Sequence, residues 1–394
     1  MNFENLKNYL DNITTKYHVP GADCIVFKDH EMVFRHSVGM SDLESGKKIS
    51  PDDLYLIYSM TKMVTCTAAL QLLEKGAYLL DDPISMYLPE FEKMKISYDE
   101  FDTSEGAKII TGSTMGAQGD KNESGYAKNP ITVRDLFTMG AGLDYDLFAS
   151  YIKEAVERGE TSTLEIVRAM SEMTLGFEPG TRFRYSLCHD VLGGLIEVWS
   201  GMKLGDYMEE NIFKPLGMKD TFFDVPKDEE RLSRLAARYV YEDDIGFVRQ
   251  ETDCVYNLSP EYQSGGAGLC SCPYDYALFA DALANGGVGI NGNRILSRFT
   301  IDLMRTNQLN TQQYIDFQEI KKGYTYGLGV RVHHDKVTSS SVSPYGEFGW
   351  DGAAGSFALV DPENKLSLVY FQHCHSWVMN MQRELRNVLY SCLE

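Results

Sequence analysis

The stretch LYLIYSMTK at residues 54–62 joins two kinds of local structure. Residues 54–57 are apolar and extended in character, and a helix is predicted from Met60 to Lys75, with Gly76 as its stop. Ser59 therefore stands at the start of a helix. At that position free backbone N–H groups and the helix dipole stabilise developing negative charge.

Lys62 follows Ser59 by three residues, so the two side chains share one face of the predicted helix. A serine hydroxyl is a poor nucleophile until another group takes its proton. A lysine can do so where burial and cationic neighbours keep part of it neutral. A serine that caps a helix, followed by a chance lysine, gives the same pattern. The S-x-x-K motif therefore indicates covalent catalysis only in combination with other elements.

The segment EPGTRFRYS at residues 178–186 forms a turn that leads into a Tyr-Ser pair, followed by a predicted helix over 190–199. A phenol placed near Ser59 and Lys62 can relay protons to a leaving group. Core packing is the alternative role for Tyr185, because the chain holds 24 tyrosines.

The glycine-rich segment GWDGAAGS at residues 349–356 precedes a predicted strand that ends near Val360. Small residues allow the backbone to approach a ligand closely. An exposed N–H on this edge, paired with the N–H of Ser59, would make an oxyanion hole. An ordinary glycine-rich turn is the structural alternative.

Strands are predicted near both chain ends and helices between them. The ends contribute helices over 3–16 and 377–393 and strands over 22–27, 32–38, 355–360 and 366–371. The middle contributes helices over 132–137, 151–158, 163–172, 190–199, 204–211 and 274–283. We therefore expect an α+β protein with a mostly antiparallel sheet built from both termini, flanked by the terminal helices, and an inserted helical lobe.

The expected sheet lobe comprises residues 1–58 and about 300–394, and the mainly helical lobe comprises about 59–299. A ligand cleft is expected between them. Residues 92–130 are mostly polar and contain glycines, which predicts a long surface excursion. This excursion is either a decorative loop or a lid.

The formal net charge of −20 disfavours nucleic acid and anionic membranes as partners. The first residues lack a basic start followed by an apolar core, and no apolar run approaches the length of a bilayer span. We therefore expect a cytoplasmic protein.

The eight cysteines are scattered, and buried reduced thiols are their expected state. Two groups raise the possibility of a metal, Cys270-Ser-Cys272 and His373-Cys374-His375, but no second pair at zinc spacing accompanies the first. A structural role is expected for both groups, and no metal or organic cofactor is expected.

The order of these elements resembles the serine β-lactamase/penicillin-binding-protein superfamily, within it the class C-like branch that includes family VIII carboxylesterases. Besides S-x-x-K, further segments carry the resemblance almost from end to end: LLDDP at 79–83, YLP at 87–89, ITVRDL at 131–136, GL at 142–143, PLGM at 215–218, GGAGL at 265–269 and YGLG at 326–329. The resemblance implies a β-lactamase-like fold with the two lobes described above.

The resemblance also implies roles for individual residues. Ser59 corresponds to the acylated nucleophile, Lys62 to its proton acceptor, and Tyr185 to the tyrosine of the Y-x-N motif. Trp350-Asp351-Gly352 stands where many members have K-T-G or H-x-G. Ala353, the next residue, would supply the second oxyanion N–H.

Two departures affect the expected substrate. Leu187 takes the Asn position of Y-x-N, and Trp350 takes the Lys or His position of the third motif. In β-lactamases and peptidases these polar residues hold an amide and a carboxylate of the substrate. A buried carboxylate without a partner is costly. Y-S-L and W-x-G resemble family VIII esterases, which favours small neutral esters.

A serine hydrolase of two-step acyl-enzyme type, most simply a carboxylic ester hydrolase, is therefore expected. The alternatives are a β-lactamase or D-amino-acid peptidase, an acyltransferase that uses the same acyl-enzyme, and a catalytically inactive binding domain. The intact Ser59, Lys62 and Tyr185 argue against the last. Asp144 and Tyr145, after the Gly-Leu turn, are expected to line the cleft mouth.

Overall fold

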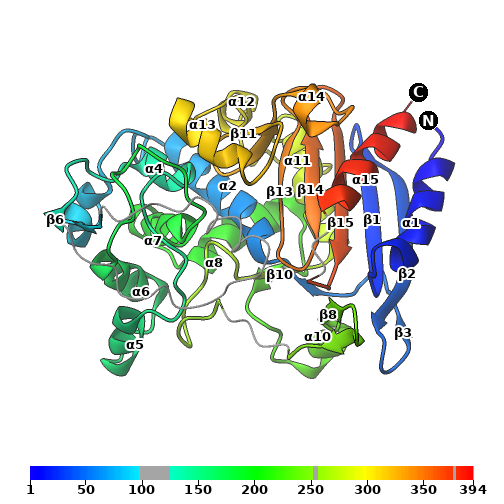
Figure 1. The fold of residues 1–394 in the computed structure, drawn as a ribbon, viewed down its shortest axis with the longest axis horizontal. Coiled ribbons are helices and arrows are strands. Elements are labelled where there is room, and N and C mark those ends of the chain that lie inside the picture. The colour runs from blue at the N-terminus through cyan, green and yellow to red at the C-terminus, as the bar shows by residue number, and fades with distance from the viewer. Residues whose placement is uncertain (98–124, 252–255, 376–378, 394) are drawn as a thin grey trace.

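A computed structural model describes residues 1–97, 125–251, 256–375 and 379–393 of the chain (Figure 1). Its largest sheet has eight strands, in the order β11-β12-β13-β14-β15-β1-β2-β3. All pairings in it are antiparallel. The strands are β1 (Gly21–Lys28), β2 (Glu31–Asp42), β3 (Lys47–Lys48), β11 (Tyr324–Tyr326), β12 (Arg331–His333), β13 (Phe348–Asp351), β14 (Phe357–Asp361) and β15 (Leu366–Gln372).

The two chain ends meet in the centre of this sheet. Strand β1 pairs with β15 over its whole length, with Ala22 opposite Gln372 and Lys28 opposite Leu366. Helices α1 (Glu4–Lys16) and α15 (Met379–Ser391) lie side by side over one face of the sheet, and both termini lie at the same end of the molecule (Figure 1).

Both faces of the central strands are buried. Cys24 and Val26 of β1 pack with α1 and α15, whereas Ile25 and Phe27 belong to the larger core on the other face. This alternation is the two-residue period of a strand. The second face is covered by α11 (Pro273–Ala284), which contacts β1, β14 and β15.

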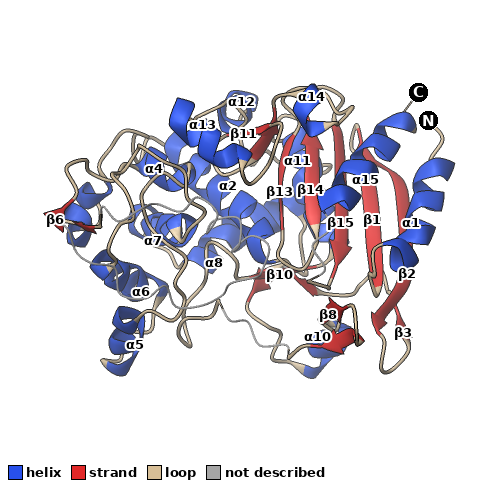
Figure 2. Cartoon of the chain, in the orientation of Figure 1, coloured by secondary structure: helices blue, strands red, loops and turns tan. Residues whose placement is uncertain are grey.

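Helices α2, α4, α5, α6, α7 and α8 gather beside the sheet (Figure 2). Residues 61–72 of α2 are all buried, so this helix runs through the core rather than over a surface. The other α-helices are α2 (Thr61–Glu74), α4 (Val133–Phe137), α5 (Ser150–Glu157), α6 (Thr163–Ala169), α7 (Cys188–Ser200), α8 (Leu204–Met208), α9 (Lys214–Leu216), α10 (Glu229–Arg234), α12 (Arg298–Met304), α13 (Thr311–Gln318) and α14 (Lys336–Ser339).

Three small sheets complete the fold. They are formed by β4 (Tyr55–Leu56) with β10 (Leu269–Ser271) and β7 (Phe222–Phe223), by β5 (Lys95–Ile96) with β6 (Gly125–Tyr126), and by β8 (Tyr239–Glu242) with β9 (Gly246–Arg249). Strand β4 leads directly into the turn that carries Ser59, and β10 holds it from the side: Ile57 N–H donates to Leu269 O at 3.0 Å.

The predicted fold class is confirmed: an antiparallel sheet is built from both termini, and terminal helices flank it. Strands β11 and β12 were not predicted, because three-residue strands carry no readable alternation. Most of the predicted excursion at 92–130 lies outside the described residues; its ends pair as β5 and β6. The division of the chain into lobes stays a prediction. No helix in the described part of the chain is long and apolar enough to cross a bilayer.

Candidate active site

Ser59 lies in a short 3₁₀ turn, Tyr58–Met60, immediately before α2. Tyr58 has a φ of +46°, a left-handed conformation that is unfavourable for a bulky residue and is found where surrounding structure enforces it. Arg238 Nη1 donates to the Tyr58 hydroxyl at 3.0 Å and helps to fix that turn. Ser59 is partly exposed between two buried neighbours, so the strained turn presents it to solvent.

Lys62, one turn further along α2, is fully buried. Its Nζ donates to the Gly266 carbonyl at 2.7 Å and lies 3.3 Å from both the Ser59 Oγ and the Tyr145 hydroxyl. Three oxygen atoms thus surround the Lys62 nitrogen and provide hydrogen-bond partners for a buried polar group that would otherwise be costly. This arrangement also holds the amine beside the nucleophile.

Tyr185 completes the group. Its hydroxyl donates to the Ser59 Oγ at 2.6 Å. The Trp350 Nε1–H donates to the same hydroxyl at 3.3 Å, and the rings of Tyr185 and Trp350 are stacked with centroids 5.8 Å apart. On its other side the Tyr185 ring stacks on Tyr145 at 5.6 Å. A stack of three aromatic rings therefore holds the phenol oxygen against the serine.

A buried carboxylate supports Lys62 from behind. Asp190 Oδ1 accepts from the Tyr262 hydroxyl and the Ser264 hydroxyl, each at 2.7 Å, and from the Gly266 N–H at 3.3 Å. These hydrogen bonds hold the turn that contains Gly266, whose carbonyl oxygen accepts a hydrogen bond from Lys62 Nζ. A Cβ added at Gly266 would lie 2.4 Å from Asp190 Oδ2, so a larger residue here would displace that carboxylate.

The edge of β13 approaches the Ser59 turn through Gly352. A Cβ at Gly352 would lie 2.5 Å from the Ile57 carbonyl oxygen, so this close approach needs a glycine. Ala353 follows and is partly exposed, as Ser59 is, between buried neighbours. His375 hydrogen-bonds to the backbone of Ala353 and packs against Tyr58 at 5.8 Å. The two expected oxyanion donors are thus on adjoining turns, and their catalytic role stays a prediction.

The structure brings Ser59, Lys62, Tyr185 and Trp350 together and places the other predicted site residues around them. Leu187 and Trp350 are buried in the same apolar core as Tyr185. Asp351, the last residue of β13, forms a close ion pair with Lys321.

The remaining predicted pair comes from the turn after α4. Tyr145 is buried beside Lys62. Asp144 is also buried, and its carbonyl accepts from the Leu187 N–H at 2.9 Å.

Desolvation governs the titration of the groups around this site. Burial among other phenols raises the pKa of Tyr145 well above its usual range. Burial lowers the pKa of His189 to about 3 and that of His375 to about 4. Both imidazoles are therefore neutral near pH 7.

The two cysteine-containing groups have structural partners. Cys272 Sγ accepts from the Asp275 N–H at the start of α11, and the His373 Nδ1 lies 2.6 Å from the Ala236 carbonyl oxygen. Across residues 1–97, 125–251, 256–375 and 379–393, no group of three or more His, Cys, Asp and Glu residues is placed to hold a metal ion. The seven cysteines in these ranges are free and buried.

Several supporting residues were not identified from the sequence. Tyr58, Asp190 and Tyr262 have no motif of their own, because their roles depend on a φ angle or on partners more than 70 residues away. The GGAGL segment was the one available signal, since it contains Gly266.

Comparisons with known proteins agree with this geometry. A family model described as Beta-lactamase matches residues 6–391. Among curated proteins, the acyltransferase calJ of Penicillium decumbens is 27% identical over 348 residues, covering 83% of this chain and 77% of that protein. Esterase EstB of Burkholderia gladioli is 24% identical over 376 residues, covering 89% of this chain and 84% of that protein.

The fold also matches solved structures. A structure titled "EstCE1, a hydrolase with promiscuous acyltransferase activity" superimposes with a TM-score of 0.75 at 22% identity, covering 98% of each chain. At this identity the match supports the fold alone.

Proposed function

The chain belongs to the Beta-lactamase family, and from that premise we propose that it is a carboxylic ester hydrolase acting on small neutral acyl substrates. The family accounts for the acyl-transferring serine chemistry. The preference for esters rests on the side chains that surround Ser59.

The proposed ester preference rests on one observation. Leu187 and Trp350, at the two positions expected to bind the polar groups of a β-lactam, are apolar side chains packed against other groups of the protein. Leu187 is buried in the core. The indole of Trp350 is stacked on Tyr185, and its single N–H is directed to the Tyr185 hydroxyl. Lys321, whose Nζ lies 5.5 Å from the Trp350 ring, is paired with Asp351. A substrate amide and carboxylate therefore meet no dedicated partner at these positions, whereas a neutral ester requires none.

The geometry suits a two-step reaction. In the first step, with Lys62 as the neutral amine, the Ser59 Oγ attacks the ester carbonyl carbon, and its proton passes to the Lys62 Nζ, 3.3 Å away. The carbonyl oxygen takes up negative charge, which the N–H groups of Ser59 and Ala353 stabilise. The C–O bond to the alcohol then breaks, and Tyr185 relays a proton from Lys62 to the departing oxygen.

In the second step a water molecule attacks the acyl-Ser59 ester. The water proton passes through the Tyr185 hydroxyl, 2.6 Å from the Ser59 oxygen, to the neutral Lys62 amine, and Lys62 returns a proton to the Ser59 oxygen as the acyl C–O bond breaks and the acid is released. Lys62 and Tyr185 transfer protons in opposite directions in the two steps, so no further base is required.

Acyl transfer to a small alcohol or amine is the second candidate. It needs the same acyl-enzyme and differs only in the nucleophile of the second step. The relative calJ, an acyltransferase that aligns with most of this chain, favours it. Amide hydrolysis is the third candidate and is disfavoured by Leu187 and Trp350. The free, buried cysteines support a reducing, cytoplasmic location.

The decisive experiment compares kcat/KM for a short-chain p-nitrophenyl ester and a chromogenic cephalosporin. We expect the wild type to prefer the ester by about a thousandfold, because two unmet hydrogen bonds to polar groups are worth about 1.5–3 kcal/mol each. Adding small alcohols and measuring transesterified product separates hydrolysis from acyl transfer.

Two variants test the cause of the preference. Leu187→Asn restores an amide partner without disturbing the Tyr185 stack and should shift the ratio toward the cephalosporin. Trp350→Phe keeps an aromatic but smaller side chain and removes the indole N–H; because it adds no partner for an amide or a carboxylate, it serves as the control that should leave the ratio unchanged. Efficient cephalosporin hydrolysis by the wild type would overturn the proposal in favour of a β-lactamase.

A further inference from the structure

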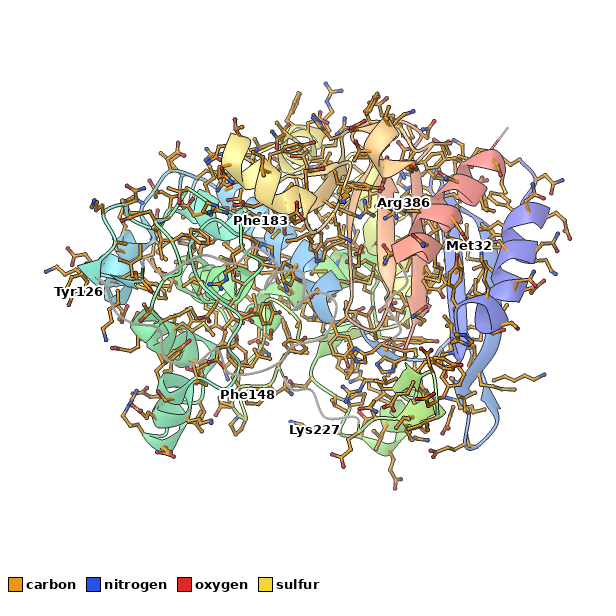
Figure 3. The ribbon with its side chains drawn as sticks, viewed as in Figure 1. Met32, Tyr126, Phe148, Phe183, Lys227 and Arg386 are labelled. Atoms are coloured by element: carbon orange, nitrogen blue, oxygen red, sulfur yellow. The ribbon has the colours of Figure 1, made fainter. Side chains whose placement is uncertain are left out.

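A cluster of buried charges lies in the sheet lobe, between α15 and strands β11–β13. It comprises Lys321, Arg331, Glu347, Asp351 and Arg386, each at most 3% exposed. Lys321 pairs with Asp351, and Arg331 Nη1 donates to Glu347 Oε1 at 2.7 Å. Arg386, labelled in Figure 3, reaches this cluster from α15, where the helix crosses the sheet. Apart from Asp351, the cluster shares no residue with the predicted Ser59 site.

A small cavity opens beside this cluster, and every charged side chain that lines it is a cation. The lining residues are Lys321, Lys322, Tyr324, Arg331, Gln382, Arg383 and Arg386. The two carboxylates of the cluster do not line the cavity. A concave surface lined by one sign of charge concentrates counter-ions of the opposite sign.

Three of the lining residues carry buried donors without acceptors. The Tyr324 hydroxyl, the Arg331 Nε–H and the Arg386 Nη2–H have no hydrogen-bond partner within the described ranges. The carboxylate oxygens are too distant: Arg331 Nε lies 3.7 Å from Asp351 Oδ1, and Arg386 Nε lies 3.8 Å from Glu347 Oε2. Buried donors nearly always have a partner, so three orphans on one cavity point to a missing acceptor.

We propose that this cavity binds a small inorganic anion of the halide class, chloride being the abundant example. A monatomic ion suits the space, which holds about one water-sized sphere, too little for sulfate or phosphate. An anion there accepts hydrogen bonds from Tyr324, Arg331 and Arg386. It also offsets the positive charge of the surrounding side chains.

The position of the cavity gives the ion a structural role. It would tie α15 to β11 and β12, which carry Tyr324 and Arg331. Lys321, which lines the cavity, binds Asp351 and lies 5.5 Å from the Trp350 ring. Occupancy should therefore stabilise the sheet lobe and the strand edge that leads to Ala353.

The first experiment measures thermal unfolding of the full chain in sodium chloride, sodium bromide and sodium gluconate at constant ionic strength. Halides should raise the Tm saturably, by about 1.5–2 °C at tenfold excess over the Kd, and gluconate should not. Crystals soaked in sodium bromide should show an anomalous peak between Tyr324, Arg331 and Arg386.

Two variants test whether the halide effect on Tm arises at this cavity. Tyr324→Phe removes one orphan hydroxyl and nothing else, so it should fold normally and weaken the halide response several-fold. Arg386→Gln should abolish that response. Arg298→Gln, an exposed arginine change on α12, is the matched control and should keep it.

Three results would overturn the proposal. One is equal Tm in halide and gluconate, and another is an unchanged halide response in Tyr324→Phe. The third is a bromide peak at molar concentration without a saturable Tm shift, which would mean an adventitious ion only.

Discussion

Tyr145 and Tyr185 allow a matched test of the proton-transfer group. Their rings are nearly parallel, 11° apart, and their centroids lie 5.4 and 4.6 Å from Lys62 Nζ. The Tyr185 hydroxyl is bonded to the Ser59 Oγ at 2.6 Å, whereas the Tyr145 hydroxyl lies 3.3 Å from Lys62. Replacing either tyrosine with phenylalanine removes the same single oxygen and leaves the aromatic stack.

The expected losses differ because the two hydroxyls do different things. Tyr185→Phe removes a group that carries a proton in the transition state, which typically contributes about 10²–10⁴-fold to kcat. Tyr145→Phe removes one long hydrogen bond to a charged amine, at the low end of the range for such bonds. That bond is worth about 1.5 kcal/mol, or about tenfold in rate.

The assay is steady-state hydrolysis of a short-chain p-nitrophenyl ester, with the acylation burst followed by stopped flow. Tyr326→Phe is the control: its ring packs against Trp350 at 5.2 Å, and its buried hydroxyl has no partner in the described structure. Its kcat should stay within about threefold of the wild type. Equal losses in Tyr145→Phe and Tyr185→Phe, with folding intact, would refute the relay role.

Three further predictions follow from the geometry. Ser59→Ala should abolish turnover and labelling by a fluorophosphonate, measured by intact mass; persistent labelling would exclude Ser59 as the nucleophile. Gly352→Ala should lower kcat about tenfold or more, because the new Cβ meets the Ile57 carbonyl; unchanged kcat would contradict the close approach. Burial lowers the pKa of both His189 and His373 to about 3, so stability is complete above pH 6.5 and falls toward pH 3, by about 1.4 kcal/mol per unit for each histidine. Denaturant unfolding at pH 7, 5.5 and 4.5 tests this, and His373→Asn should flatten the slope.

The local sequence pattern was sufficient to predict the nucleophile and the longer helices and strands. The start of a predicted helix after an extended segment was enough to identify Ser59 and Lys62, because the two residues lie within one helical turn of each other. The central strands β1, β2, β14 and β15 were also predictable, because short runs of apolar residues are bounded there by polar turns.

Long-range partners were not predictable from pattern. The acceptor for Lys62 is a carbonyl 204 residues away, and the partner of Asp351 is a lysine 30 residues earlier. Neither contact has a periodicity or a turn signal, because the fold alone sets which loops meet. The left-handed φ of Tyr58 could not be predicted from the sequence either, since bulky residues rarely adopt this conformation.

The burial of α2 explains how the site reconciles two conflicting demands. A proton-accepting lysine must be shielded from water, whereas the serine one turn earlier must meet the substrate. Residues 61–72 are all buried, so the helix places Lys62 in the core, while the 3₁₀ turn that precedes the helix leaves Ser59 partly exposed. Thr65, one turn beyond Lys62, donates to the Gly265 carbonyl at 2.6 Å and ties α2 to the same loop that receives Lys62 through Gly266. The packing that stabilises the core therefore also sets the distance between amine and hydroxyl, and a change in that packing should alter kcat before it unfolds the chain.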